Sequence, residues 1–223
     1  MVNEVVDVQG FFAVFAAYNS ALWPFAAALW MLSIAAFLSV LRGRRSDRLV
    51  MVFLALQWAW TSIAYHWAYF AAINSAATAF AGVFLLQAGL LGVSAWRGSV
   101  RFSWRPTVQH FAGASLVVYS LAYPALAALL VGAYPRIPTF GVPCPTTLLT
   151  VGFLLMTTRP ALPLMIIPLL WPMVGGSAAV LFDVIPDFAL IVAVLAVIVS
   201  TIAPLSIERS ADRAPRDSNE RLR

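Results

Sequence analysis

The chain has 223 residues, of which 62% are hydrophobic and only 10% are charged, and its formal net charge at pH 7 is +5. Soluble domains contain about 45–50% apolar and about 25% charged residues, so this composition excludes a soluble globular fold as well as a disordered, collagen-like or disulfide-rich chain. The mean hydropathy of +0.88 indicates that lipid is the solvent for much of the chain.

Residues 1–20 are predicted to form an amphipathic segment on the outer surface of a membrane. Apolar and aromatic residues recur at helical spacing between Val5 and Tyr18, with polar residues between them. This spacing is typical of a helix that lies in the membrane interface. The alternative is that the segment is an N-terminal extension of the first membrane span. Because the first ten residues include no basic residue, we expect no cleaved secretory signal.

The following region, residues 21–206, predicts an all-α, polytopic membrane helix bundle with about seven transmembrane helices. A helix rises about 1.5 Å per residue and the hydrocarbon core is about 30 Å thick, so about 20 residues are needed to cross it. The apolar segments are 21–41, 49–70, 75–96, 110–132, 145–158, 161–182 and 187–206. Only 145–158 is shorter than this length. In a six-span alternative this segment would be re-entrant.

The arginines favour seven spans and fix the expected orientation. The chain has no lysine, and 13 of its 14 arginines fall on one side of a seven-span arrangement, with Arg136 alone on the other. Since excess arginine marks the cytoplasmic side, we expect the N-terminus outside and a disordered cytoplasmic tail over 207–223. Six spans would place the arginines of this tail outside. The positive net charge therefore follows from topology, and nucleic acid is not an expected partner.

The connection before the short fifth segment, residues 134–147, contains four prolines, which forbid a regular helix or a central strand. Pro145 suits the first turn of the fifth helix. Because that helix would cover only about 21 Å of a core of about 30 Å, its outer end is expected below the outer surface. Irregular backbone at such depth is tolerated where protein or a water-filled cavity satisfies it. This Pro-rich loop therefore indicates either a binding site or a loop that merely caps the bundle.

Polar side chains from the same leaflet are predicted to face the Pro-rich loop and to form an outward-facing ligand-binding pocket beneath it. The candidate ligand-binding residues are Asn19, Tyr65, His66, Asn74, Thr139, Cys144, Thr146, Thr147 and Asp183. The alternative is that the aromatic residues form an interfacial belt and the carboxylates are simply solvated. For His66, the corresponding alternative is a structural hydrogen bond.

Metal, cofactor and catalytic sites have little support in the sequence. His66 and His110 lie near opposite faces, so they do not ligate one haem together. A Cu(I) site from His66, Cys144 and Met173 lacks any CxxC, HxxxH or Met-rich run. Retinal requires a lysine, and the hydrolase, metalloprotease and nucleotide motifs are missing. We expect no metal, cofactor or catalytic residue, the alternative being a Cys144 nucleophile with His66 as its base.

Two glutamines are predicted to fix the packing of neighbouring spans. Gln57 and Gln87 lie at similar depth in adjacent antiparallel segments, which favours a direct amide pair between them. In the sixth segment, Pro163, Pro168 and Pro172 are expected to kink the helix, and Gly175-Gly176 to allow close helix approach.

Several motifs together resemble a family of bacterial multi-pass inner-membrane proteins of unknown function. They are Tyr18-Asn19 with Trp23-Pro24, Tyr65-His66 with Ile73-Asn74, Pro138-Thr-Phe-Gly-Val-Pro-Cys-Pro-Thr-Thr147, and Ile167-Pro-Leu-Leu-Trp171 with Gly175-Gly176. The resemblance covers most of residues 11–206, and the loop motif is its most specific part. It implies a location in the bacterial inner membrane and no particular activity.

The function that these observations favour is a small-solute or ion permease, and an enzyme is less favoured. The alternatives are a metal-binding or electron-transfer accessory membrane protein and a structural subunit of a membrane complex. The expected partners are the lipid bilayer, a small solute or ion, and either another subunit of a membrane complex or a second copy of the chain.

Overall fold

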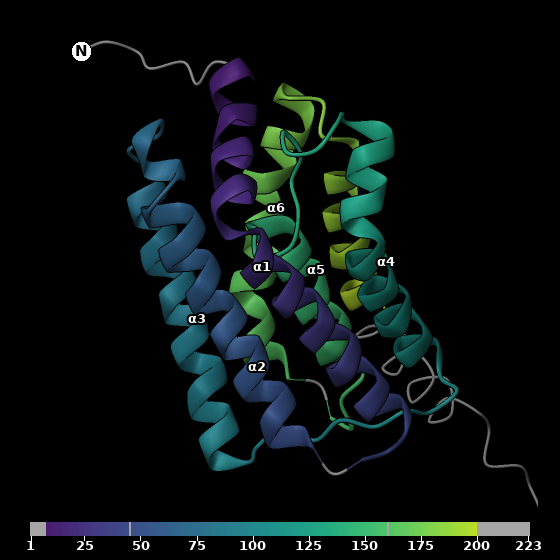
Figure 1. Cartoon of the computed structure of the whole chain (residues 1–223). Helices are drawn as coiled ribbons and strands as arrows, with labels where there is room; N and C mark the ends of the chain where they lie inside the picture. The colour runs from purple at the N-terminus through teal and green to yellow at the C-terminus, as the bar shows by residue number, and fades with distance from the viewer. Residues whose placement is uncertain (1–7, 45, 160, 200–223) are drawn as a thin grey trace, which may run out of the picture.

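A computed structural model describes residues 8–44, 46–159 and 161–199, so the predicted tail 207–223 lies outside the described residues. Over these residues the chain is helical, with one isolated β-bridge between Phe102 and Thr157 (Figure 1). This confirms the all-α class. The elements are α1 (Val8–Leu41), α2 (Asp47–Trp60), η1 (Thr61–Trp67), η2 (Phe70–Ala72), α3 (Ala77–Arg97), α4 (Val108–Leu130), α5 (Pro143–Leu155), α6 (Leu162–Leu181) and η3 (Ile185–Phe188).

Five of the described helical segments are long and apolar enough to cross a membrane. They are α1, the continuous stretch Asp47–Ala72, α3, α4 and α6. Two further apolar helices, Pro143–Leu155 and Ile185–Val199, are shorter. The chain thus has the helices expected of a membrane protein, whereas the seven crossings and the orientation stay predictions.

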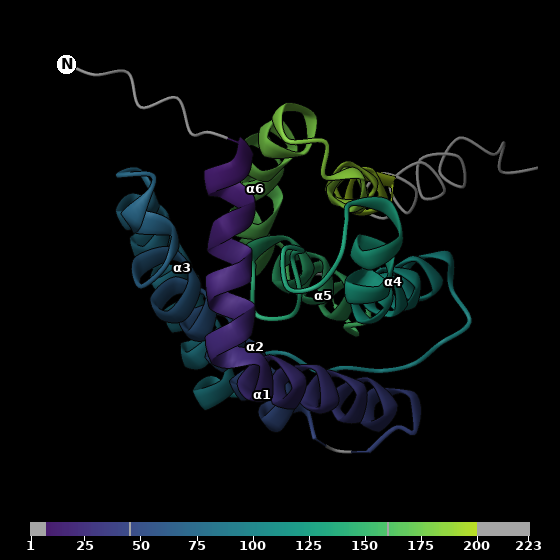
Figure 2. The same cartoon turned by 45° about the horizontal axis from the view of Figure 1, so that its top comes forward.

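Helix α1 is continuous across the boundary expected at residue 20. It runs for 34 residues with Pro24 inside it, and it bends near this proline, so that its two halves point in different directions (Figure 2). A proline removes one helical hydrogen bond and its ring pushes on the preceding turn, which accounts for the bend. Residues 8–20 are therefore a helical arm joined to the first candidate span. Their position on an outer surface stays a prediction.

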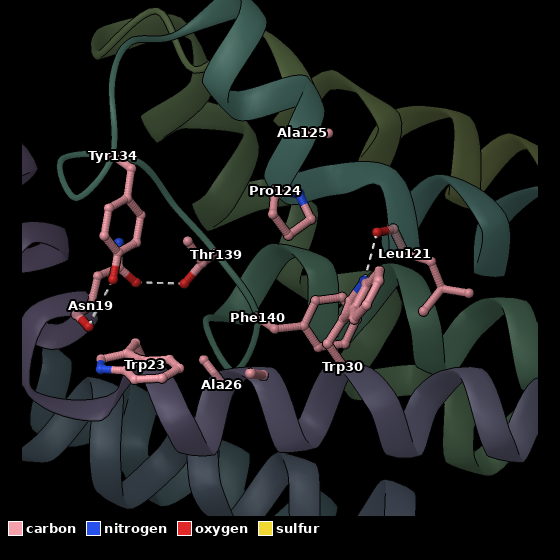
Figure 3. A pocket seen from close by; sticks show the side chains of 11 residues that line it. Asn19, Trp23, Ala26, Trp30, Leu121, Pro124, Ala125, Tyr134, Thr139 and Phe140 are labelled. Carbon is pink, nitrogen blue, oxygen red and sulfur yellow. Dashed lines mark hydrogen bonds between the residues drawn. The ribbon is translucent and has the colours of Figure 1, made fainter.

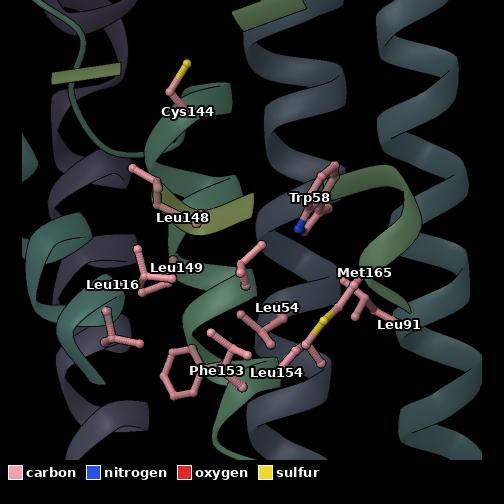
Figure 4. Packing of buried hydrophobic residues seen from close by; sticks show 14 of the residues in the cluster. Leu54, Trp58, Leu91, Leu116, Cys144, Leu148, Leu149, Phe153, Leu154 and Met165 are labelled. Atoms are coloured by element: carbon pink, nitrogen blue, oxygen red, sulfur yellow. The ribbon is translucent and has the colours of Figure 1, made fainter. Parts of the chain in front are cut away.

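The short helix α5 lies at the centre of the molecule (Figure 2), and all 13 of its residues are buried. Its apolar side chains pack against α2, α4 and α6, and Figure 4 shows Leu148, Leu149, Phe153 and Leu154 among them. One polar contact crosses the same core, because the Trp58 indole donates to the Thr150 hydroxyl at 2.8 Å.

The direct amide pair predicted for Gln57 and Gln87 is wrong. Both residues are fully buried, but the Gln87 amide donates to the Leu164 carbonyl at 2.8 Å, and the Gln57 amide has no hydrogen-bond partner among the described residues. The reason lies in α6, where Pro168 has no N–H to donate to the carbonyl four residues before it. Gln87 satisfies that carbonyl instead.

This arrangement makes the effect of losing Gln87 depend on Pro168. We expect Gln87→Leu to lower the free energy of unfolding by about 0.6–2 kcal/mol, the range for interhelical hydrogen bonds in membranes. In a Pro168→Ala background the loss should be smaller, because the new N–H can satisfy Leu164. Unfolding titrations of the four variants in mixed micelles measure this coupling, with Gln57→Leu as the control that loses no hydrogen bond. Equal losses in both backgrounds would contradict the assignment.

Candidate functional site

A cavity of about 460 Å³ lies among the α1 arm, η1, the start of α5, the end of α6 and η3. We call it the His66 cavity. Its walls are mainly apolar and aromatic. The lining residues are Val8, Phe11, Phe15, Tyr65, His66, Phe70, Asn74, Phe80, Pro138, Val142, Pro143, Cys144, Trp171, Val174, Gly175, Ser177, Leu181, Phe182 and Asp187. Four predicted site residues, Tyr65, His66, Asn74 and Cys144, are thus brought together, and the Pro-rich loop contributes to the wall.

The π-helical turn η1 places Tyr65 and His66 in this wall. Its first residue, Thr61, donates its hydroxyl to the carbonyl of Gln57 at 2.9 Å, a local bond that is typical of bent helices. The same hydroxyl lies 3.1 Å from the Gly141 carbonyl and 3.1 Å from the Thr146 hydroxyl. These contacts tie the turn to the Pro-rich loop and to α5. π-Helical turns occur frequently at functional sites.

His66 is only 1% exposed, yet neither of its ring nitrogens has a hydrogen-bond partner in the described part of the chain. Aromatic rings surround it instead. The ring centroids of Phe84, Tyr65 and Trp171 lie 4.7, 5.4 and 5.5 Å from that of the imidazole. A buried polar group without a partner destabilises the fold by about 1–3 kcal/mol, so native proteins rarely contain one without a reason.

The opposite wall carries a thiol and a carboxyl group. Cys144 lies in the first turn of α5, and its thiol interacts with the Asp187 carboxyl at the start of the helix Ile185–Val199. Asp187 is 5% exposed and accepts a hydrogen bond from the Tyr123 hydroxyl of α4. The described lining of the cavity therefore includes one carboxyl group and no arginine.

Asp183, the carboxylate predicted for the site, is exposed and does not line the His66 cavity. It stands in the turn after α6 with a φ of 55°. Asp187 takes the place expected for Asp183, because the chain reverses in that turn and η3 carries its side chain inward. A sequence signal for Asp187 does exist, since it directly follows Pro186 in the first turn of an apolar helix, where an acidic residue is common.

Asn19 and Thr139 line a second cavity of about 420 Å³, between α1 and α4 (Figure 3). The Asn19 amide donates to the carbonyls of Pro135 and Ile137, both at 2.7 Å, and accepts from the Thr139 hydroxyl at 2.5 Å. The Tyr134 hydroxyl donates to the Asn19 carbonyl at 3.2 Å. Because these polar groups are satisfied by one another, they fix the Pro-rich loop on α1 and leave little for a ligand.

The remaining predicted residues, Thr146 and Thr147, are buried and line neither of these two cavities. Thr146 bonds to η1 as described, while the Thr147 hydroxyl has no partner in the described part of the chain. Depth in the bundle could be read from the sequence for these residues. The direction in which each side chain points around its helix could not.

The alternatives that involve metal or catalysis are not assembled in the described residues. No group of three or more His, Cys, Asp or Glu side chains there could hold a metal ion. Met173, the third residue of the Cu(I) alternative, is 75% exposed and is not part of the cavity wall. Cys144 and His66 share the cavity, but no hydrogen bond joins them, since both imidazole nitrogens lack partners.

Residues 8–211 match a family of unknown function, DUF6064, and the chain belongs to that family. No curated protein and no solved structure matches the chain. The expected relationship to a family of unknown function is thereby confirmed, and it brings no activity with it.

Proposed function

We propose that this member of the DUF6064 family is a permease of a bacterial inner membrane that binds a small, mainly apolar solute in the His66 cavity. The observation that carries the proposal is the unpartnered imidazole of His66, which is nine-tenths or more buried and lies in the wall of a cavity of about 460 Å³. A solute with one hydrogen-bonding group would satisfy it.

The chemistry of the walls favours a small organic solute over a bare inorganic ion. Ligand pockets of about 300–1,000 Å³ are lined mainly by apolar and aromatic side chains, with a few polar groups that orient the ligand. The His66 cavity has this composition. A bare ion needs several oxygen or nitrogen ligands at once, and the described residues do not gather such a set here.

The elements around the cavity favour transport over static binding. Solute sites of many transporters lie where membrane helices are interrupted, because the irregular backbone can rearrange and coordinate. Here α2 passes into the π-helical turn η1, α6 contains Pro168 and Pro172, and a turn separates α6 from η3. All three interruptions adjoin the cavity or its helices.

The test uses Cys144, which is the only cysteine of the chain, as a reporter of access to the cavity. A small, membrane-impermeant thiosulfonate is applied in separate experiments to intact spheroplasts and to inverted vesicles. A permease predicts modification of Cys144 from both sides, faster from the side of the Pro-rich loop. The control is Cys144→Ser combined with Leu148→Cys, which moves the thiol one turn along α5 to a fully buried position outside the cavity wall.

The control variant should stay unmodified until the protein is denatured. Modification of Cys144 from one side only would be consistent with a binding cavity but would contradict transport through it. Resistance of folded Cys144 from both sides, with ready modification after denaturation, would mean that the Pro-rich loop is a dry cap, and the proposed function would fail.

A further inference from the structure

We infer that the solute of the His66 cavity is a small organic cation, such as a primary ammonium compound, with Asp187 as its counter-ion. The inference rests on the proposed function and adds the class of ligand to it. Three features of the cavity lead to this conclusion: an uncompensated carboxyl group, aromatic walls and a neutral acceptor.

The carboxyl group of Asp187 is the only charged side chain that is buried in the described residues. The groups that interact with it, the Tyr123 hydroxyl and the Cys144 thiol, are neutral, and no described arginine or histidine forms an ion pair with it. A carboxyl group away from water either takes up a proton or pairs with an opposite charge, and intramembrane carboxylates commonly serve as ligand counter-ions. Among the described residues no arginine lines the cavity, and the nitrogens of its one histidine, His66, make no hydrogen bond to Asp187, so a cationic ligand is the partner that would keep this carboxyl group ionised.

The walls suit a cation and disfavour an anion. Tyr65, Phe70 and Trp171 present aromatic rings to the cavity, and the negative faces of such rings attract ammonium groups. His66 adds an acceptor, because a neutral imidazole has one nitrogen lone pair that can take an N–H of the ligand. An anion would meet the carboxylate of Asp187, and the described lining offers no arginine to hold it.

Cys144 connects these features, because its thiol interacts with Asp187 and it lines the same cavity as Trp171, whose ring centroid lies 5.5 Å from that of His66. A reagent that reaches the thiol therefore experiences the electrostatics of the proposed site. Two thiosulfonates of similar size, one with a trimethylammonium and one with a sulfonate group, probe this directly. Each rate at Cys144 in purified protein is divided by the rate of the same reagent with 2-mercaptoethanol.

The corrected ratio of cationic to anionic rates is expected to exceed about tenfold in the natural chain. Asp187→Asn, which keeps the size of the side chain, should bring the ratio close to one, and Asp187→Glu should retain most of the preference. Asp183→Asn is the matched control, because it removes an exposed carboxylate four residues away, and asparagine tolerates the positive φ there. In a second arm, 2-phenylethylammonium should slow modification of Cys144 more than the neutral 2-phenylethanol does.

A ratio near one in the natural chain, or a preference that Asp187→Asn leaves unchanged, would overturn the cation assignment. Equal protection of Cys144 by 2-phenylethylammonium and 2-phenylethanol would also overturn the cation assignment. It would indicate a neutral solute beside a protonated Asp187. In each of these outcomes Cys144 still reacts, so the proposed function survives. If Cys144 reacts with neither reagent in the folded protein, the cavity is not accessible to a solute. Both the proposed function and the cation assignment then fail.

Discussion

Replacement of Asn19 by alanine is expected to lower the free energy of unfolding by at least about 2 kcal/mol, because two carbonyls of the Pro-rich loop lose their donor at once. The Asn19 amide is the donor to Pro135 and Ile137, and Thr139 loses its acceptor as well. Pro138 and Val142, in the same loop, line the His66 cavity. We therefore also expect faster modification of Cys144, since the released loop no longer closes that wall.

Chemical unfolding in micelles measures the first effect, and the rate of thiol modification measures the second. Gln9→Ala is a suitable control, because Gln9 joins the same arm of α1 to the same loop through an exposed contact with Arg136 at 2.8 Å. Surface changes of this kind alter stability by less than about 0.5 kcal/mol. Asn19→Asp keeps an acceptor for Thr139 but sets a carboxylate oxygen against the two carbonyls, so it should destabilise at least as much as the alanine variant. An Asn19→Ala protein as stable as Gln9→Ala would refute the assigned role.

Gly152→Ala is the second change with a large expected effect. A Cβ at this position would lie 2.8 Å from the Gly113 carbonyl oxygen and 2.9 Å from the Val117 backbone nitrogen of α4. Backbone atoms cannot turn aside as the end of a side chain can, so α4 and α5 have to separate. Overpacking of this kind destabilises by about 1–3 kcal/mol.

The sign of the effect distinguishes close packing from helix propensity. Alanine is favoured over glycine inside a helix by about 1 kcal/mol, and a Cβ added to Gly89 of α3 would meet no neighbouring atom within 4 Å. Gly89→Ala should therefore leave stability unchanged or raise it, while Gly152→Ala lowers it. Thermal unfolding of both variants in the same detergent compares them. Stabilisation by both substitutions would show that α4 and α5 are not held at glycine contact.

The ends of several helices could be predicted because the signals are local. The expected segments 75–96 and 161–182 compare with Ala77–Arg97 and Leu162–Leu181. At one end, Gly98 adopts a φ of 61°, which suits the residue after a helix. At the start of α4, the Thr107 hydroxyl accepts from the His110 N–H, a usual N-cap contact.

The partners of the polar residues could not be predicted, because they depend on how each helix is rotated against its neighbours. The proline that frees the Leu164 carbonyl is visible in the sequence, but nothing local shows that Gln87 of another helix faces it. Likewise, which of Asp183 and Asp187 lines the cavity depends on the turn in which Asp183 has a positive φ. The sequence gives no sign of this turn, because no glycine stands at the position with positive φ. Tyr123 becomes part of the site only because α4 packs beside η3.

The central position of α5 has a consequence for the order in which the protein assembles during biosynthesis. Its 13 residues extend over only about 20 Å, less than the roughly 30 Å of a hydrocarbon core, and none of them is exposed at the surface. Long apolar helices can be released into lipid one by one before they associate. We expect α5 to be unstable as a single helix in lipid, because it is too short to span the hydrocarbon core and its buried side chains pack against other helices. We therefore expect the insertion of α5 to be a step of tertiary folding, which is completed only after α6 has been synthesised and can pack against it.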